Sequence, residues 1–357
     1  MANLTWAFNM TATHAQKHFD MIIVGGGVVG LTLALCLARE NFTIAIVEKQ
    51  KWCFDNLIEE YDTRVFAIHD TSLRILDNLG LLQKMRALRS SPFYKIAVWD
   101  KEGDGFIEFD NRLALHLPMG EILEQKVLLY ALYTSLKNQT NVTFFEEAAI
   151  IEIHSKQAHL RLPNILLTAD WMLACDGAQS AVREAAMIPW QRYSYQQQAI
   201  IATLACEKNH GQTARQAFFS KGTLALLPLK DSNKISLVWS WEERDSHRLM
   251  QLSAQDFVQE LAHKMDGCLG HFQLLGKRFT YPLYKAQAAK YWQHRCILVG
   301  DAAHVIHPLA GQGINLGILD AASLRDIFVE WRNLKKLSSK RLLNYYQRHR
   351  RGHSTFL

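Results

Sequence analysis

The chain has 357 residues, of which 49% are hydrophobic and 21% are charged. This is an ordinary globular composition, and the length predicts about two domains. The formal net charge of +6 is modest and no run of five basic residues occurs, so nucleic acid is not expected as a partner. Six scattered cysteines form no Cys-x-x-Cys pair. That pattern indicates neither a zinc site nor a disulfide framework, and it favours the reducing cytoplasm.

Two features of the first 38 residues bear on targeting. Residues 1–18 are polar and predict a poorly structured lead-in, whereas residues 21–38 carry no charge and are long enough to raise the question of a membrane-spanning helix. Glycines interrupt the first half of this stretch, and no small-residue cleavage pattern follows it. We therefore expect neither a signal peptide nor a transmembrane helix.

The same stretch matches a dinucleotide-binding β–α–β unit. Residues 19–24 predict a buried strand, residues 31–39 a helix and residues 43–47 a second strand. A Gly-x-Gly-x-x-Gly turn joins strand to helix, and an acidic residue ends the second strand, where it can accept hydrogen bonds from a ribose. The glycines allow a tight turn and a close approach of a pyrophosphate to the helix N-terminus. The residues concerned are Gly25, Gly27, Gly30 and Glu48.

The following segment gives weaker signals. Asp62 and Arg64 are most simply a solvated ion pair. A Gly-Asp-Gly turn predicts a hairpin, which we place as a small insertion near residues 93–118, and a helix is expected from residue 120 or 121 to 136. A short apolar strand at 171–175 ends in Asp176-Gly177, a common turn sequence that here stands where a strand passes to a helix.

Beyond residue 190 the pattern changes to alternating strands, which predict an antiparallel sheet with one helix near residues 254–264. Trp239 and Trp241 share one face of their strand and are expected in its core, with the lining of an aromatic pocket as the alternative. The sequence thus predicts an α/β fold: a Rossmann-like domain with a central parallel sheet, made of residues 19–190 and 283–357, and an inserted antiparallel-sheet substrate domain at 191–282.

The chain returns to the first domain at an apolar strand, residues 296–299, followed by a glycine-rich turn and a helix from residue 314. Strand, turn and helix start form a corner suited to an anion. His304 and His307 are spaced by three in a loop without a third ligand, so we expect hydrogen bonding rather than a metal site, with proton exchange as an alternative.

Three glycine-bearing strand ends are therefore predicted, at Gly25–Gly30, Asp176-Gly177 and Gly300-Asp301. Together with the sequence Gly-Asp-Ala-Ala-His, then His-Pro-Leu-Ala-Gly-Gln-Gly and Asn-Leu-Gly, they resemble the FAD-dependent aromatic hydroxylases, and among them the hydroxylases of ubiquinone biosynthesis. The resemblance covers nearly the whole chain from residue 19. Relatives of this family usually continue beyond the position where this sequence ends, so we expect either a longer natural chain or a missing C-terminal cover.

The resemblance implies a role for each matching residue. The first motif and Glu48 would bind the ADP half of FAD, Asp176 would contribute to flavin and NAD(P)H handling, and Gly300 with Asp301 would contact the ribityl chain and pyrophosphate. Arg64 matches an Asp-x-Arg position near the flavin. Glu124-Gln125-Lys126-Val127-Leu128 resembles the family's Glu-Asn-Arg-Val-Leu, although Gln125 and Lys126 depart from it. The full set of implied cofactor residues is Gly25, Gly27, Gly30, Glu48, Arg64, Gln125, Asp176, Gly300, Asp301 and Asn315.

Around the flavin ring, a helix N-terminus opened by Gly311, Gln312 and Gly313 would supply backbone donors, and no titratable catalyst is assigned. The resemblance implies that NAD(P)H and O2 serve to hydroxylate a polyprenylated phenol through a flavin C4a-hydroperoxide. Three alternatives stay open: another aromatic substrate, a non-catalytic FAD-holding member of a quinone-synthesis assembly, and a flavin dehydrogenase. We expect a cytoplasmic protein, and leave open membership of a quinone-biosynthesis complex and peripheral contact with the inner face of the membrane.

Overall fold

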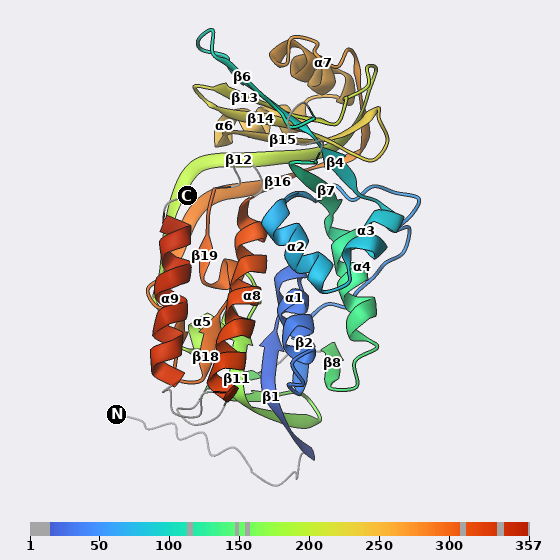
Figure 1. The fold of residues 1–357 in the computed structure, drawn as a ribbon. Coiled ribbons are helices and arrows are strands. Elements are labelled where there is room, and N and C mark those ends of the chain that lie inside the picture. Colours follow the sequence, from blue (N-terminus) through green and yellow to red (C-terminus); the bar gives the residue numbers. More distant parts are fainter. Residues whose placement is uncertain are drawn as a thin grey trace, which may run out of the picture.

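The computed structural model describes residues 15–112, 117–146, 150–153, 158–307, 312–333 and 339–355. Two large sheets dominate it, one in each half of the molecule (Figure 1). The first is the predicted parallel sheet, with the order β17-β18-β11-β1-β2-β8 and the β9–β10 hairpin beside β11. Its strands are β1 (Ala15–Val24), β2 (Ile44–Glu48), β8 (Val142–Glu146), β9 (Ile150–Ile153), β10 (Ala158–Arg161), β11 (Ile165–Ala174), β17 (Trp292–Gln293) and β18 (Cys296–Leu298).

Helices cover this sheet because their apolar faces have no other place to bury. Helix α1 packs between α4 and α8, and α9 packs on α8 (Figure 1). Ten of the eleven residues of α1 are buried, which explains why it is apolar on every side. The helices of this half are α1 (Val28–Ala38), α2 (Asp70–Asn78), α3 (Leu82–Leu88), α4 (Gln125–Leu136), α5 (Ala181–Ala185), η1 (Gly300–Ala302), α8 (Gln312–Asn333) and α9 (Ser339–Thr355).

The structure corrects the expected start of the ordered chain. Strand β1 begins at Ala15 and so includes the last four residues of the predicted lead-in, because Ala15–His18 continue the parallel pairing with β11. Residues 1–14 lie outside the described part. The uncharged stretch 21–38 is divided between β1, the glycine turn and α1. Within the described residues, no helix combines the length and apolar character that a membrane crossing requires.

The second sheet has the order β19-β16-β12-β15-β14-β13-β5-β6. Helices α6 (Glu243–Gln251) and α7 (Ala254–Lys264) cover one face, where Trp239 and Trp241 are buried as predicted. Strands β12 and β16 run side by side from one half to the other (Figure 1). The strands are β5 (Lys95–Asp100), β6 (Phe106–Asp110), β12 (Trp190–Cys206), β13 (Thr213–Phe219), β14 (Gly222–Pro228), β15 (Lys234–Glu242), β16 (Phe272–Ala288) and β19 (His304–Val305).

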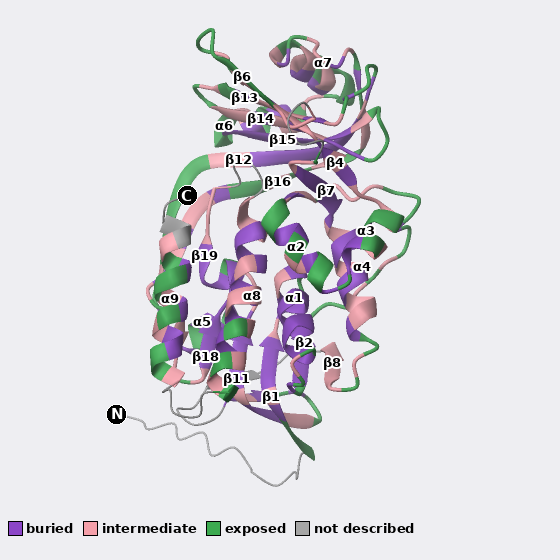
Figure 2. Cartoon of the chain, viewed as in Figure 1, coloured by how far each residue is buried: buried purple, intermediate pink, exposed green. Residues whose placement is uncertain are grey.

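Two local predictions differ from the structure. The hairpin β5–β6, expected as an insertion in the first domain, extends the second sheet, because β5 pairs in parallel with β13. The helix expected from residue 120 or 121 begins at Gln125, and the preceding residues form the buried strand β7 (Gly120–Glu124). β7 lies between β3 (Val65–His69) and β4 (Ser91–Phe93) in a small antiparallel sheet at the boundary of the two halves (Figure 2).

A buried histidine stabilises the loop between β14 and β15. The Nε2–H of His210 faces the carbonyl oxygens of Leu229 and Asp231 at 2.9 and 3.0 Å, and its Nδ1 accepts the backbone N–H of Gln212 at 3.0 Å. These partners require the neutral imidazole. Burial is the main reason why the pKa of His210 is lowered from the ordinary 6.5.

This arrangement predicts a pH-dependent contribution to stability. The stabilisation by neutral His210 should be complete above about pH 6.5 and should be lost as the pH falls below that value, because the unfolded chain then binds the proton more readily. Between about pH 7 and about pH 5, urea unfolding should show a larger loss of stability for the wild type than for His210→Asn. Parallel curves for the two proteins would contradict this role.

Candidate cofactor site

The predicted nucleotide motifs meet at one edge of the parallel sheet. Val24, Ala174 and Leu298 are register neighbours in β1, β11 and β18, and Val47 of β2 is paired with Val24. The residues that follow them therefore emerge side by side at the carboxyl ends of the strands, where open α/β sheets bind ligands. These residues are Gly25, Glu48, Cys175 with Asp176, and Val299 with Gly300. Pairing in space thus joins motifs that lie far apart in the sequence.

The three glycines of the first motif have different physical tasks. Gly25 has a φ of +102° and a Cβ there would lie 2.3 Å from the Cys175 carbonyl oxygen, while a Cβ on Gly30 would lie 2.0 Å from the Gly25 carbonyl oxygen. Both positions therefore need glycine for the fold itself. Gly27 is different, because a Cβ there would meet nothing within 4 Å. Its open side adjoins the first turn of α1, which has no side-chain cap and no acidic residue.

Glu48 lies beside this turn. One oxygen of its carboxylate accepts the Gly26 N–H at 2.6 Å and the other accepts the Gln50 N–H at 3.1 Å. Trp52 completes the contact, since its indole N–H donates to the Gly26 carbonyl at 2.9 Å. Both polar groups of the Gly26 backbone are thereby fixed. The sequence motif identified Glu48, whereas nothing in it pointed to Trp52.

Asp176 is the first residue of the second motif, and only one of its two carboxylate oxygens has a hydrogen-bond partner among the described residues. Its Oδ2 accepts the Val182 N–H at 3.2 Å, while its Oδ1 is buried and has no hydrogen-bond partner among the described residues. Burial is the main cause of the raised pKa of its carboxyl group. Arg183 links this motif to the third, because it donates to the carbonyl oxygens of Ala178 at 2.9 Å and Ala302 at 3.1 Å.

The third motif is held from behind by a buried carboxylate on α8. Asp320 is fully buried; its Oδ2 accepts the Gly300 N–H at 3.0 Å and His304 Nε2–H at 2.7 Å, and its Oδ1 accepts from Arg350 of α9. Arg350 also donates to the Leu316 carbonyl at 3.2 Å. We call Gly300, His304, Asp320 and Arg350 the Asp320 cluster. Burial alone would raise the pKa of Asp320, but the charges and hydrogen bonds of His304 and Arg350 lower it.

Asp301, next to Gly300 of the cluster in the sequence, is exposed. The pKa of its carboxyl is nevertheless raised, chiefly because surrounding protein limits its hydration, while His304 and Arg64 act in the opposite direction. His304 thus has a structural hydrogen bond, as predicted. His307 lies against Tyr195, with ring centroids 4.8 Å apart, and partial burial lowers its pKa.

The start of α8 lies at the same edge. Gly311 falls outside the described residues, α8 begins at Gln312, and a Cβ on Gly313 would meet nothing within 4 Å. Asn315 has a different surrounding, because its amide donates to the Ala67 carbonyl at 2.8 Å and accepts the His69 N–H at 3.1 Å. Its side chain therefore ties α8 to β3, and contact with a cofactor stays a prediction.

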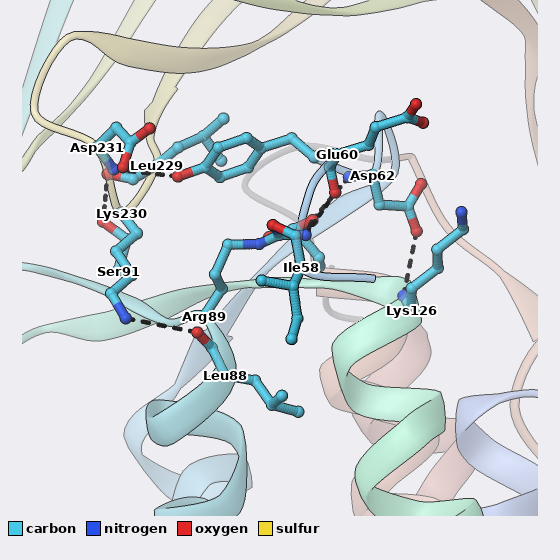
Figure 3. Close-up of polar contacts among 12 residues, drawn as sticks. Ile58, Glu60, Asp62, Leu88, Arg89, Ser91, Lys126, Leu229, Lys230 and Asp231 are labelled. Atoms are coloured by element: carbon cyan, nitrogen blue, oxygen red, sulfur yellow. Dashed lines mark hydrogen bonds and ion pairs between the residues drawn. The ribbon is translucent and has the colours of Figure 1, made fainter. Parts of the chain in front are cut away.

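Arg64 and Gln125 are held together by a polar network in the loop before β3, and Figure 3 shows its hydrogen bond between Asp62 and Lys126. Gln125 N–H donates to the Arg64 carbonyl at 2.9 Å, and Asp62 accepts the N–H groups of Arg64 and Lys126 at 3.0 and 3.1 Å. Asp62 therefore caps α4 through the backbone instead of serving only as a solvated ion-pair partner. Buried Glu124 in turn accepts the Asp62 N–H at 2.6 Å.

The Arg64 side chain is exposed, and its guanidinium lies 5.7 Å from the Tyr281 ring of β16. The same loop reaches the second sheet at Tyr61, whose hydroxyl accepts the Asp231 N–H at 3.2 Å. Arg89 fixes the loop: it pairs with Glu124 at 2.7 Å, and its guanidinium lies 4.5 Å from the centroid of the Tyr61 ring. It also donates to the carbonyl oxygens of Ile58 and Glu60 (Figure 3). The segment carrying Arg64 is thus connected to both halves of the molecule.

These residues fit the ADP half of a bound FAD. The uncapped start of α1 offers backbone N–H groups to a pyrophosphate, and Gly27 leaves the space for its approach. Glu48 would supply an acceptor for ribose hydroxyls, and Asp176, whose Oδ1 has no hydrogen-bond partner among the described residues, would be a further acceptor at the same edge. No group of three metal-binding side chains occurs among the residues that the structure describes.

The FAD binding domain family matches residues 18–356. The chain belongs to this family. It is 33% identical over 336 residues to 3-demethoxyubiquinol 3-hydroxylase of Escherichia coli (strain K12), covering 93% of this chain and 85% of that protein. It is 34% identical over 319 residues to ubiquinone hydroxylase UbiL of Rhodospirillum rubrum, covering 88% of this chain and 73% of the relative.

Solved structures share the fold. PqsL, a probable FAD-dependent monooxygenase from Pseudomonas aeruginosa, superposes with a TM-score of 0.77 at 20% identity, over 95% of this chain and 93% of PqsL. The p-nitrophenol 4-monooxygenase PnpA from Pseudomonas putida gives 0.75 at 20% identity, over 94% and 85%. The predicted fold class, the FAD cofactor and the class of FAD-dependent monooxygenase are thereby confirmed, and NAD(P)H is the donor typical of the family.

Gly27 gives a test that separates cofactor binding from folding. Because its φ is −73° and its Cβ position is open, Gly27→Ala should leave the unfolding temperature of the apoprotein within about 2 °C of the wild type. It should nevertheless weaken FAD binding by roughly tenfold or more, since the methyl group would occupy the space of the pyrophosphate. Flavin fluorescence titration measures the affinity. Gly30→Ala is the control that should fail to fold, and unchanged FAD affinity in Gly27→Ala would exclude the assigned contact.

The Asp320 cluster gives a stability test. Arg350→Leu should lower the free energy of unfolding by about 3–5 kcal/mol, because it leaves a buried carboxylate short of one partner, and should also reduce the FAD retained on purification. The matched control is Arg341→Leu, an exposed arginine of the same helix, which should change stability by less than about 0.5 kcal/mol. Equal effects of the two substitutions in denaturant unfolding would argue against the cluster.

Proposed function

We propose that this FAD-dependent monooxygenase hydroxylates the aromatic ring of a polyprenylated phenol in ubiquinone biosynthesis, with NAD(P)H and O2 as co-substrates. The observation that carries the proposal is the match to 3-demethoxyubiquinol 3-hydroxylase over 93% of the chain. A match of that extent includes both the cofactor edge and the second sheet, which would hold the substrate. The similarity to ubiquinone hydroxylase UbiL supports the same substrate class.

In this proposal the chain's own residues bind and orient the cofactor. The N-terminus of α1, with Gly25, Gly27 and Gly30, takes the pyrophosphate, and Glu48 accepts from the adenosine ribose. Asp301 and Gly300 contact the ribityl and phosphate groups, and Asp176 offers its free Oδ1 to the flavin half. Arg64 and Gln125 lie together on the loop network that faces the second sheet.

The environment of the flavin ring would come from Gly311, Gln312 and Gly313 at the start of α8. Bound FAD supplies the activation of oxygen, which no amino-acid side chain can supply. The positive end of the α8 dipole would face the flavin ring and favour negative charge there through backbone N–H groups, and the glycines would let this backbone come close. A general base on the protein is not required for the oxygen transfer itself.

The substrate would lie between this helix start and β16. Phe279 and Tyr281 are two residues apart on β16, so they point to the same face, and both are exposed, at 43% and 42%. Arg64 stacks on Tyr281, which shows that this face looks toward the first domain. Exposed aromatic side chains at that position suit a phenol ring and the apolar chain attached to it.

Three alternatives have separate signatures. A hydroxylase of another aromatic compound would share the cofactor edge but leave ubiquinone levels unaffected. A non-catalytic FAD-holding member of a quinone-synthesis assembly would bind FAD without phenol-stimulated oxidation of NAD(P)H. A flavin dehydrogenase would reduce acceptors without consuming oxygen. Association with other quinone-biosynthesis enzymes and peripheral contact with the membrane are part of the proposal.

The decisive experiment is a quinone profile of cells that lack this protein. Ubiquinone should fall and a polyprenylated phenol lacking one ring oxygen should accumulate, because the hydroxylation step is blocked. Wild-type protein should restore the profile and Asp301→Ala should not. The accumulated phenol should stimulate oxygen consumption by the purified FAD-loaded enzyme. Normal ubiquinone without an accumulated phenol would refute the assignment.

A further inference from the structure

Positive charge in this chain is concentrated near its end. Residues 332–351 contain eight lysines and arginines and no aspartate or glutamate. Against the +6 of the whole chain, this leaves the remainder with a formal net charge of −2. The modest net charge of the whole chain is therefore the sum of a strongly basic segment, residues 332–351, and a weakly acidic remainder.

Helix α9 has a buried side and an exposed side (Figure 2). Arg350 points inward to Asp320, and Leu342, Leu343 and Tyr346 are buried with it against the first domain. The outward side is exposed at four cations, which we call the basic face of α9. They are Lys340, Arg341, Arg348 and Arg351.

The basic face is compact. At about 100° per residue, its four cations fall within an arc of about 100° around the helix axis, along a helix of roughly 25 Å. Lys340, Arg341 and Arg348 line an open hollow of about 480 Å³ together with Asn344 and Gln347, so every side chain that lines it can donate hydrogen bonds and none is a carboxylate. No ion pair joins these three cations to any carboxylate in the described part of the chain.

The inward side makes this face rigid. Tyr346 donates to the Leu298 carbonyl of β18 at 3.1 Å, and Arg350 is bound in the Asp320 cluster. Lys340, Arg341 and Arg348 therefore keep their arrangement without an ion-pair partner among the described residues, whereas Arg351 donates to the Ala289 carbonyl at 3.3 Å. Unpaired like charges on one face repel each other, which is a cost to the folded protein unless an anionic surface compensates it.

We propose that the basic face of α9 docks the protein on a bilayer containing anionic phospholipid. The choice of lipid over other polyanions rests on the proposed function, because a substrate with a polyprenyl chain resides in the membrane. The arrangement of the face agrees with that choice, since a row of cations along one side of a surface helix can lie along a flat anionic surface. Tyr345, 54% exposed beside the cations, is a residue type that prefers the interface between water and lipid.

Nucleic acid fits this face less well. Binding of single strands uses a groove with several aromatic rings on which bases stack. Tyr345 is the exposed large aromatic residue of α9, and it is already stacked on His349, with ring centroids 5.8 Å apart and an interplanar angle of 11°.

The test is sedimentation of the FAD-loaded protein with vesicles. Wild-type protein should bind vesicles of phosphatidylcholine with phosphatidylglycerol, should not bind pure phosphatidylcholine, and should be released by high salt. The triple variant Lys340→Gln, Arg341→Gln, Arg348→Gln should lose about a hundredfold in partition coefficient, which is the effect expected for three cations near an anionic surface.

A matched control removes the same net charge elsewhere. Lys208→Gln, Arg244→Gln, Lys277→Gln changes three exposed cations of the second half and should bind anionic vesicles within about threefold of the wild type. Both variants should keep wild-type FAD content and unfolding temperature. Equal losses in the two variants would reduce the effect to net charge and overturn the proposal.

Three other outcomes would also overturn it: no binding of wild-type protein to anionic vesicles, equal binding to neutral vesicles, and retention by a single-stranded oligonucleotide in place of vesicles. Vesicle sedimentation measures membrane binding and not hydroxylation. A negative result would therefore leave the hydroxylase proposal standing, to be tested by the quinone profile. A normal quinone profile combined with vesicle binding through α9 would refute the substrate assignment alone.

Discussion

The cofactor edge depends on one buried carboxylate. A charge as deeply buried as that of Asp320 is tolerated only when donors satisfy both oxygens, and here the donors come from η1, β19 and α9. The same requirement for a partner applies to Arg350, because its guanidinium is also buried and is paired with Asp320. The turn that presents Asp301 is therefore fixed by groups behind it, which leaves the Asp301 side chain free to face outward.

Close packing at Val29 extends this constraint to the first motif. A Cβ on Gly317 of α8 would lie 2.5 Å from the Val29 side chain, and one on Gly300 would lie 3.3 Å from it. The turn of the third motif and the second turn of α8 thus both lie against Val29, at the start of α1. Since α1 also follows the turn to which we assign the pyrophosphate, this packing keeps the first and third motifs, the two proposed to hold the dinucleotide, at one spacing.

The sequence predicted those parts of the site that depend on local geometry. Gly25, Gly30 and Glu48 are recognisable because a tight turn and a strand-end acid have fixed spacings along the chain. Asp320 and Arg350 were missed, since each looks like an ordinary polar residue of a helix, and only the packing of α8 on α9 brings them together. A charged residue among apolar neighbours in the stretch 314–328 was the available signal.

The fold shows the same division between local and long-range information. The apolar strands β1, β2, β11 and β18 were predicted because buried parallel strands are continuous apolar runs. The long strand β16 was not, since much of it is polar or exposed and its place is set by pairing with β12. The parallel pairing of β5 with β13 is likewise invisible in a local hairpin pattern, which fixes the turn and not the neighbour.

Helix α9 contributes both to the buried Asp320 cluster and to the exposed basic face. Arg348 and Arg350 are two residues apart, so they point to opposite sides of the helix, one into solvent and the other to Asp320. An arginine at 350 supports the cofactor turn only because the helix is pressed against α8 and β18, and that same packing holds the outward cations in a row. Cofactor support and a basic surface therefore require one helix in one orientation.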